Sequence, residues 1–527
     1  MRLSEAEHQL VEAVAAGRQL DFADAPDRTV RADVLRDLLL GKLVDALDPR
    51  GVRLSGAVVT GSLDLADVRS ESPLVLVACE VPEPLVLRRA RLAGLTLDGC
   101  TVEHIDADEL HSAGPVLLDG IRCAGGISLA YADVGGALSL QRAWLETGPR
   151  VAVKADGITV AGNVVLTNGF HADSACQEGT VRFPAARIGG QLRLTGAVLR
   201  NDGGGPALLA DSAQVAVSII LTGLRATADS GAAVRLVRTQ TKSMLYLDDA
   251  TIENPDGVAL NATAVQVGAD LRLGPGLRTS GAAAFPGAHV KGQLRVADVR
   301  LAGGTPRLDL TEVTVDGPIS LPVGELVNAD PAFRIAVDGL TYRRVPFAAS
   351  VDEWLALLRR HTPGYTAQPY QQLAAVHRAA GHERDTKRIL IAQQRDLGER
   401  GQLGGFAARL RHRASGFLLG HGYRPTRPLA GLLATLLLAC VLVLGADNDT
   451  AVRAADGVKA CTVTEHLAMA ANLSIPVVRL ASQRQCEFVP TTPAGQWYVV
   501  AGWIVTLLGW GFATLFVAGY TGLVRKT

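Results

Sequence analysis

One polar stretch of the sequence carries side chains suited to metal binding or to acid–base chemistry. Residues 103–111 read Glu-His-Ile-Asp-Ala-Asp-Glu-Leu-His. Carboxylates and imidazoles bind divalent metals and transfer protons, so His104, Asp106, Asp108 and His111 form a candidate polar cluster. Because alternate residues of a strand point to opposite faces, only some of these side chains can meet. The simpler interpretation, which we favour, is a solvated corner between strands.

A search for the usual sites of catalysis and cofactor binding finds none in the sequence. It has no G-x-G-x-x-G between a strand and a helix, no P-loop, no G-x-S-x-G and no C-x-x-C. His377 and His382 flank Gly381 and could clamp a metal ion, but two ligands alone do not define a site. The sequence therefore identifies no catalytic residue, no cofactor and no metal site, and it leaves open whether the chain is an enzyme.

A repeated phrase indicates the framework that must position these residues. It runs aliphatic-x-Gly-x-aliphatic-x-aliphatic and ends, for example, at Leu65, Leu140, Leu166, Leu194, Val296 and Leu321. From Leu140 onward its last position recurs about every 25 residues, and a fixed period of this length indicates a solenoid. Apolar residues two positions apart predict strands with one buried face.

Three short strands per unit predict a parallel β-helix whose stacked coils form ladders of Leu and Val. We expect the glycine of the phrase to give the backbone the freedom that a coil corner needs. In residues 51–140, leucines such as Leu54, Leu65 and Leu76 lie eleven apart, which predicts half-coils with shorter corners. Roughly a dozen coils, each about 4.8 Å thick, are expected.

The remaining segments divide around this repeat. Residues 1–50 have a helical pattern, with Ser4 and Glu7 placed as a capping box, and are expected to cover the open end of the β-helix. The fold class is mainly β, and the predicted order is an N-terminal helical cap (1–50), a parallel β-helix of about 25-residue coils (51–345), a cytoplasmic helical neck (346–426), a transmembrane helix (427–446), an extracytoplasmic loop (447–496), a second transmembrane helix (497–520) and a basic tail (521–527).

Two apolar segments support the membrane assignment. Residues 429–446 and 497–520 are uncharged and long enough to span a bilayer as helices. By the positive-inside rule, their outer flanks are cytoplasmic, because they carry Arg409, Arg411, Arg413, Arg424, Arg427, Arg525 and Lys526. The expected location is the inner or plasma membrane, with the β-helix and the C-terminus in the cytoplasm.

The predicted membrane topology also suggests roles for two cysteines and for the small residues of the apolar helices. Cys461 and Cys486 share the predicted outside loop, where disulfides are stable, so we predict a disulfide between them. The alternative is two unrelated thiols. A stripe containing Gly502, Thr506 and Gly509 predicts close packing of the apolar helices, either within one chain or between the chains of a homo-oligomer.

Two features of the sequence bear on its possible binding partners, namely its charge balance and the predicted helical neck. The sequence has 52 basic and 52 acidic residues, so it carries no electrostatic footprint of nucleic-acid binding. Residues 370–381 read as a helix ended by Gly381, and residues 382–400 read as its partner. This hairpin is interpreted as a rigid spacer, with a docking surface as the alternative.

The assembled features resemble a family of actinobacterial membrane-anchored proteins often labelled membrane-associated oxidoreductase. The matching pieces are the Val-x-Gly-x-Leu-x-Leu coils, the run Tyr370-Gln-Gln-Leu-Ala, residues 472–480 (NLSIPVVRL) and residues 519–525 (GYTGLVR). The coils are also similar to those of pentapeptide-repeat proteins, although their units are longer. The resemblance implies the architecture, the membrane location and, by its label alone, a redox activity, but it supplies no catalytic residues.

Three functions are consistent with these features. The favoured one is a membrane-tethered cytoplasmic β-helix that acts as a scaffold or binding surface for a cytoplasmic protein partner. The first alternative is a membrane-associated oxidoreductase, implied by the family label. The second is an oligomeric two-span channel or sensor, because an apolar segment lies between the two spans, although no selectivity-filter motif is present. The predicted partners are thus the lipid bilayer and a protein, and not nucleic acid.

Overall fold

The chain forms two compact units, Met1–His382 and Glu383–Thr527. The structure is a computed structural model that describes residues 2–23, 25, 27–44, 47–401, 404–405, 409, 426–446, 452–454, 461–475 and 486–520. The boundary between the units lies inside the predicted neck. Helix α5 (Gln368–Ala379) therefore belongs to the first unit and α6 (Glu383–Arg400) to the second.

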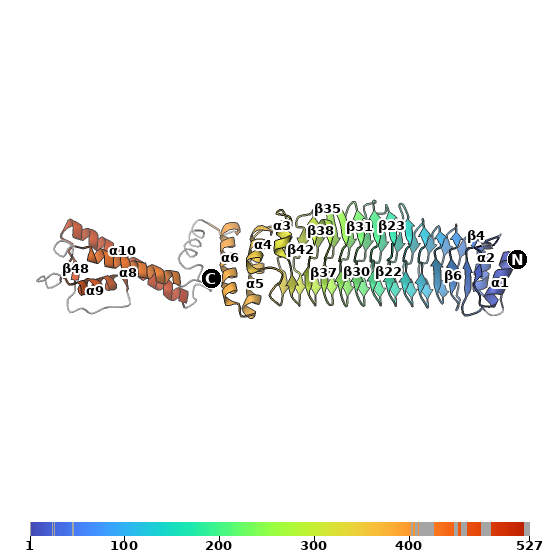
Figure 1. The fold of residues 1–527 in the computed structure, drawn as a ribbon, viewed down its shortest axis with the longest axis horizontal. Coiled ribbons are helices and arrows are strands. Elements are labelled where there is room, and N and C mark those ends of the chain that lie inside the picture. Colours follow the sequence, from blue (N-terminus) through green and yellow to red (C-terminus); the bar gives the residue numbers. More distant parts are fainter. Residues whose placement is uncertain are drawn as a thin grey trace. The chain divides into compact units, whose positions relative to one another are not determined.

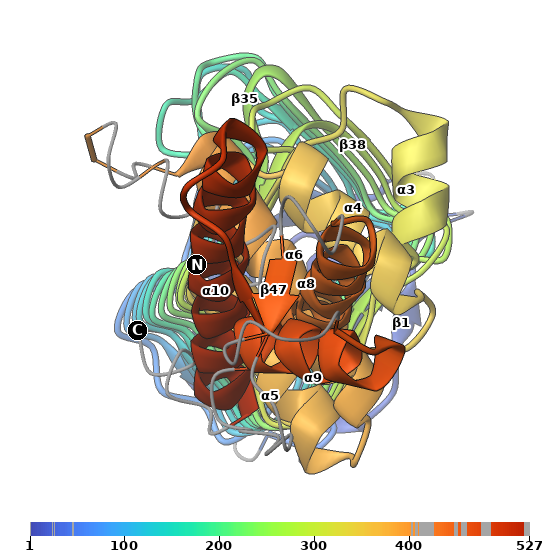
Figure 2. The same ribbon diagram turned by 90° about the vertical axis from the view of Figure 1, so that its left-hand side faces the viewer.

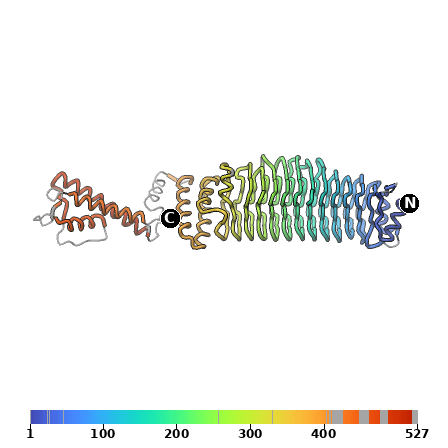
Figure 3. The backbone as a smooth tube through the Cα atoms, viewed as in Figure 1, coloured from blue at the N-terminus to red at the C-terminus, as the bar shows by residue number. Residues whose placement is uncertain are grey.

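The first unit is a parallel β-solenoid of about 12 turns, as the repeat predicts (Figure 1). Its strands form a 13-stranded, a 22-stranded and an 11-stranded sheet, here called sheets A, B and C. One coil illustrates the order: β10 (Leu95–Asp98) lies in sheet A, β11 (Thr101–Val102) and β12 (Ile105–Asp106) in sheet B, and β13 (His111–Ser112) in sheet C. The trace in Figure 3 shows successive coils as a stack.

Aliphatic ladders fill the interior of the solenoid. Leu54 pairs in register with Leu76, and Leu76 with Leu97, and all three are fully buried. Leu65 follows β5 (Leu63–Asp64) in sheet B, so leucines eleven residues apart alternate between two sheets of one coil. Burying each such side chain stabilises the fold by about 1.5–3 kcal/mol. Viewed along the solenoid, the coils containing β35 (Thr251–Asn261) and β38 (Arg278–Ala284) lie one behind the other (Figure 2).

The glycine of the repeated phrase has a role that differs from the predicted one. Gly162 and Gly317, unlike Gly61, lie outside the left-handed region of backbone space, so the predicted corner role is wrong for them. A Cβ added to Gly317 would lie 2.4 Å from the carbonyl oxygen of Gly292 in the preceding coil. Glycine is needed here because neighbouring coils approach closely.

Other left-handed corners of the coils lie at residues other than glycine. Arg89, Arg142 and Asp249 have φ values of 54°, 58° and 54°. Each lies two residues after a buried leucine, namely Leu87, Leu140 and Leu247. The corner is therefore fixed by the stacking of the coils, which offsets the strain of left-handed backbone at these residues.

Helices cover the N-terminal end of the solenoid. Strand β1 (Leu20–Asp21) pairs with β3 (Val52–Ser55) of sheet A, and β2 (Thr29–Arg31) pairs with β4 (Val58–Thr60) of sheet B. Helix α1 (Glu5–Ala15) begins with the expected capping box of Ser4 and Glu7. Helix α2 (Ala32–Leu39) follows β2 directly. These elements shield the first coil, whose open edge would otherwise template aggregation.

A second group of helices covers the other end of this unit. It consists of α3 (Val323–Ala329), α4 (Val351–Arg360) and α5. Trp354 of α4 packs against Tyr342, with 6.3 Å between ring centroids, and Tyr342 ends β46 (Thr341–Tyr342), the final strand of sheet C. Gln368 of α5 donates through Nε2 to the carbonyl oxygen of Leu340, over 2.9 Å. A side chain of α5 thus forms a hydrogen bond with a backbone group that would bond to the next coil if the solenoid continued.

The second unit contains two helices that are long and apolar enough to cross a membrane. They are Thr426–Leu444 (α8, mean hydropathy 2.2) and Pro493–Ala518, within α10 (Pro493–Tyr520), with mean hydropathy 1.8. A shorter helix, α9 (Val463–Ser474), packs with both through a buried cluster of Ala439, Val443, Ala470 and Val505. A Cβ on Gly509 would lie 2.2 Å from the carbonyl oxygen of Ser474, so this small residue lets α9 approach α10.

Candidate functional site

The structure divides the predicted polar cluster between two sheets. His104, Asp106 and Asp108 line one surface pocket of about 360 Å³ beside sheet B. His111 begins β13 in sheet C, because the chain turns a left-handed corner at Glu109 between the two strands. Three of the four predicted side chains are therefore brought together, and the fourth is not.

The three side chains of that pocket are engaged with neighbouring coils. Arg88 donates to Asp106 over 2.6 Å, and the backbone N–H of Ala130 donates to Asp108 over 3.0 Å. His104 Nδ1 contacts the carbonyl oxygen of Gly125 at 2.9 Å. These bonds tie each coil to the next, which is the role expected of polar residues at a corner.

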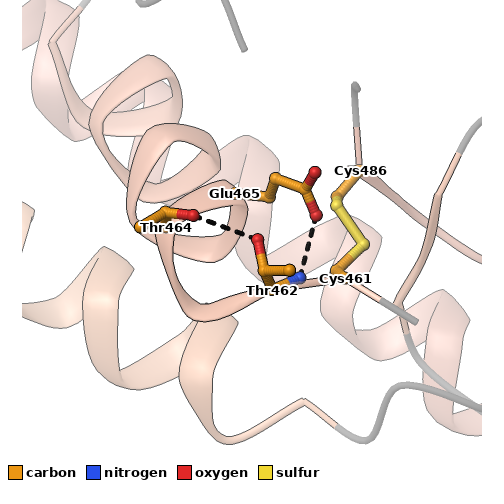
Figure 4. The surroundings of a disulfide bond; sticks show 5 residues. All are labelled: Cys461, Thr462, Thr464, Glu465 and Cys486. Atoms are coloured by element: carbon orange, nitrogen blue, oxygen red, sulfur yellow. Dashed lines mark hydrogen bonds between the residues drawn. A yellow bond between two sulfur atoms is a disulfide. The ribbon is translucent and has the colours of Figure 1, made fainter. Parts of the chain in front are cut away.

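The two other predicted pairs also lie close together. The Nδ1 atoms of His377 and His382 are 3.4 Å apart. Cys461 and Cys486 are joined by a disulfide, shown in Figure 4 beside the capping box of α9, where the backbone N–H of Thr462 donates to Glu465 over 2.8 Å. Cys486 begins β48 (Cys486–Phe488), which pairs antiparallel with β47 (Val452–Ala454). The bond thus joins the residue before the N-cap of α9 to this two-stranded sheet.

A larger feature, which the sequence reasoning did not single out, lies on the outer face of sheet C. It is a groove of about 660 Å³, here called the sheet C groove. Six strands that are neighbours in sheet C line the groove: β21 (Thr159–Val160), β25 (Arg187–Ile188), β29 (Gln214–Val215), β33 (Gln240–Thr241), β36 (Gln266–Val267) and β39 (His289–Val290). At about 4.8 Å per strand, the groove extends about 24 Å along the solenoid axis.

Two rows of outward residues define the groove. The first row is held in register by the strand pairing and consists of Thr159, Arg187, Gln214, Gln240, Gln266 and His289. The second row lies two residues further along each strand and consists of Ala161, Gly189, Ala216, Lys242, Gly268 and Lys291. The residue between the rows points inward and is buried in each strand, for example Val215 and Val267.

The first row presents a ladder of three side-chain amides. Gln214, Gln240 and Gln266 are all exposed, and each pairs in register with the next. Each amide carries both donors and an acceptor. Their spacing of 26 residues is visible in the sequence, and each glutamine begins a strand of sheet C. That regularity is the signal that could have revealed the groove.

The groove is cationic. Arg187, Lys242 and Lys291 are exposed, and none of them forms an ion pair with another described residue. Among the described lining residues there is no carboxylate, and His289 is the only aromatic ring. Asp316 comes directly after β43 (Thr314–Val315), the strand of sheet C that pairs with β39 outside the groove. It contacts His289 Nε2 at 3.1 Å and Arg343 at 3.0 Å. The hydrogen bond with His289, together with the charge of Arg343, lowers the pKa of Asp316. Asp316 is therefore a carboxylate, and the cationic surface ends there.

Glycines keep the second row open. A Cβ on Gly268 would lie 2.2 Å from the carbonyl oxygen of Lys242 in the preceding coil, and the same holds for Gly189 and the carbonyl oxygen of Ala161. No side chain therefore stands between Lys242 and Lys291. A ligand backbone can approach sheet C closely at these positions.

The fold and its surface features define a class: this is a parallel β-solenoid protein that carries two helices able to cross a membrane. Searches against protein-family models, curated proteins and solved structures found no match to the chain. The groove and the two apolar helices are the features of the described residues that bear most directly on function.

Proposed function

We propose that this protein is a membrane-tethered binding scaffold whose solenoid presents the sheet C groove to a protein partner. The observation that carries the proposal is the groove itself, which has an amide ladder in register on three neighbouring strands and three exposed cations on alternate strands. Unpaired exposed charges contribute little to folding but attract and orient a partner of opposite charge. A rigid, repetitive surface of this kind suits the binding of an extended partner.

The proposal includes an orientation in the membrane. Arg427 lies in the first turn of the first apolar helix, and further arginines precede this helix in the sequence. Arg525 and Lys526 follow the second helix in the sequence. Excess positive charge on both outer flanks supports a cytoplasmic position for the solenoid and an external position for the segment that contains Cys461 and Cys486. A disulfide in that segment agrees with an oxidising compartment. The groove would then face cytoplasmic proteins at the membrane surface.

Site-directed photo-crosslinking in intact cells tests the proposal. A photoreactive amino acid replaces Gln240 in the groove, and in a matched variant it replaces Arg193, which is exposed on sheet A. We expect a discrete protein adduct at position 240 that is lost when Lys242→Glu is added, and no such adduct at position 193. Equal adducts at both positions, or none at position 240, would overturn the proposal.

A further inference from the structure

We infer that the sheet C groove binds an acidic peptide segment in the extended polyproline II conformation, with a carboxylate at every third residue. This inference rests on the proposed scaffold function and assigns the chemistry of its partner. It concerns the six strands from β21 to β39, whose outward side chains line the groove.

The spacing of the cations carries the inference. Arg187, Lys242 and Lys291 lie on β25, or directly after β33 and β39, and one strand separates each member of this series from the next. Strands of a sheet are about 4.8 Å apart, so Lys242 and Lys291 of the second row lie about 9.6 Å apart along the groove. Arg187, in the first row, lies about the same distance further along the solenoid axis. A polyproline II helix rises about 3.1 Å per residue with three residues per turn, so its side chains repeat at about 9.3 Å. The two periods match closely.

The strand between two cations provides the second match. A polyproline II segment makes no internal hydrogen bonds, so its backbone N–H and C=O groups need partners. Gln214 and Gln266 lie on the strands between the cationic ones, and Gln240 begins β33, which Lys242 directly follows. Their amides can donate to and accept from a peptide backbone. Gly268 leaves the space through which that backbone can approach.

The lining argues against other anionic polymers. Proteins that bind single-stranded nucleic acid rely on aromatic rings that stack on the bases, and His289 is the only ring among the described residues that line the groove. An extended β-strand is also a poorer match, because its same-face side chains repeat at about 6.7 Å. An acidic peptide in the polyproline II form therefore fits both the charge and the period.

Fluorescence anisotropy on the full-length protein in detergent micelles tests this assignment. The probes are labelled twelve-residue peptides of identical composition, rich in Pro and Ala, with four Glu at every third residue, at every second residue or in one block. We expect the every-third peptide to bind at least tenfold more tightly than the other two, and its affinity to fall with added salt.

Charge variants locate the binding. Lys242→Glu and the milder Lys242→Gln should each weaken binding of the every-third peptide at least tenfold, whereas Arg193→Glu on sheet A should leave it unchanged. Because Lys242 is exposed, neither change removes a core contact. Equal binding of all three peptides, or binding unaffected by either Lys242 variant, would overturn the inference. Failure of every acidic peptide alongside a persistent cross-link at position 240 would overturn the ligand chemistry while leaving the scaffold function intact.

Discussion

Gln372 donates through Nε2 to the carbonyl oxygen of Tyr342 over 2.6 Å. Tyr342 ends the last strand of sheet C, so its carbonyl oxygen has no further coil to bond. A neighbouring helical side chain, Gln368, donates to Leu340 and accepts from the backbone N–H of Gly339. Helix α5 therefore ends the solenoid by supplying side-chain amides where the next coil would supply backbone amides.

The first prediction concerns this C-terminal edge. Gln372→Ala removes a hydrogen bond from a sheltered backbone carbonyl, which should cost about 1.4 kcal/mol. Hydrogen exchange of residues 335–345 should become about tenfold faster. Gln371→Ala is the matched control, because Gln371 is exposed and lies on the same turn. Equal exchange in the two variants would show that the amide contributes nothing to the edge.

A second prediction concerns pH and the N-terminal cap. Arg31 donates through Nε to Glu7 over 2.7 Å, and this hydrogen bond lowers the pKa of the buried Glu7 carboxyl from 4.5 to about 2. A carboxyl with a lowered folded-state pKa stabilises the fold above its unfolded pKa, and this contribution is lost as pH falls from about 4.5 to about 2. The loss should be about 2–3 kcal/mol.

Hydrogen exchange of residues 5–15, corrected for intrinsic rates, checks this dependence. In the parent chain, protection should fall between about pH 4.5 and pH 2. In Glu7→Gln, protection should already be low at pH 6 and change little over that range. Glu5→Gln, at an exposed position of the same helix, should behave as the parent. A parent-like pH profile in Glu7→Gln would contradict the assigned role of the Arg31 contact.

A third prediction concerns the glycines between coils. Gly317→Ala places a Cβ 2.4 Å from the carbonyl oxygen of Gly292, so the coils must move apart. The variant should lose about 1–3 kcal/mol, the usual cost of overpacking. Gly364→Ala is the control, because nothing lies within 4 Å of a Cβ built there. Urea denaturation followed by circular dichroism should show a lower midpoint for Gly317→Ala alone; coincident curves would contradict the close-approach argument.

A fourth prediction concerns the orientation in the membrane. If the segment with Cys461 and Cys486 lies outside, a membrane-impermeant maleimide should label it in intact cells only after an impermeant reductant opens the disulfide. A cysteine introduced at Gln240 should be labelled only after the cells are permeabilised. Labelling of position 240 in intact cells would reverse the proposed topology.

The fold was largely predictable, because a solenoid repeats one simple pattern. The alternation of apolar and polar residues around Leu192 and Leu194 predicts a strand, and its return at a fixed period predicts stacked coils. The role of the glycines was not predictable in the same way. Whether Gly317 serves a corner or a close approach depends on the coil stacked against it, which the local sequence does not contain.

The candidate site was only partly predictable. The sequence of residues 103–111 places several carboxylates and imidazoles close together along the chain, but a corner at Glu109 puts His111 in a different sheet from Asp106. Conversely, Gln214, Gln240 and Gln266 lie 26 residues apart, so no local window contains two of them. Only the register of sheet C makes them neighbours. The residues of a surface formed by stacked coils lie one repeat apart in the sequence, so they can be recognised only by comparing positions at that period.

Native mass spectrometry of the full-length protein extracted from its own membranes, with an absorption spectrum of the same sample, tests the central claim most directly. The scaffold account predicts a complex of the chain with a second polypeptide, no visible chromophore, and loss of that polypeptide in Lys242→Glu. A chain that carries a stoichiometric flavin, haem or nicotinamide and no second polypeptide would contradict it.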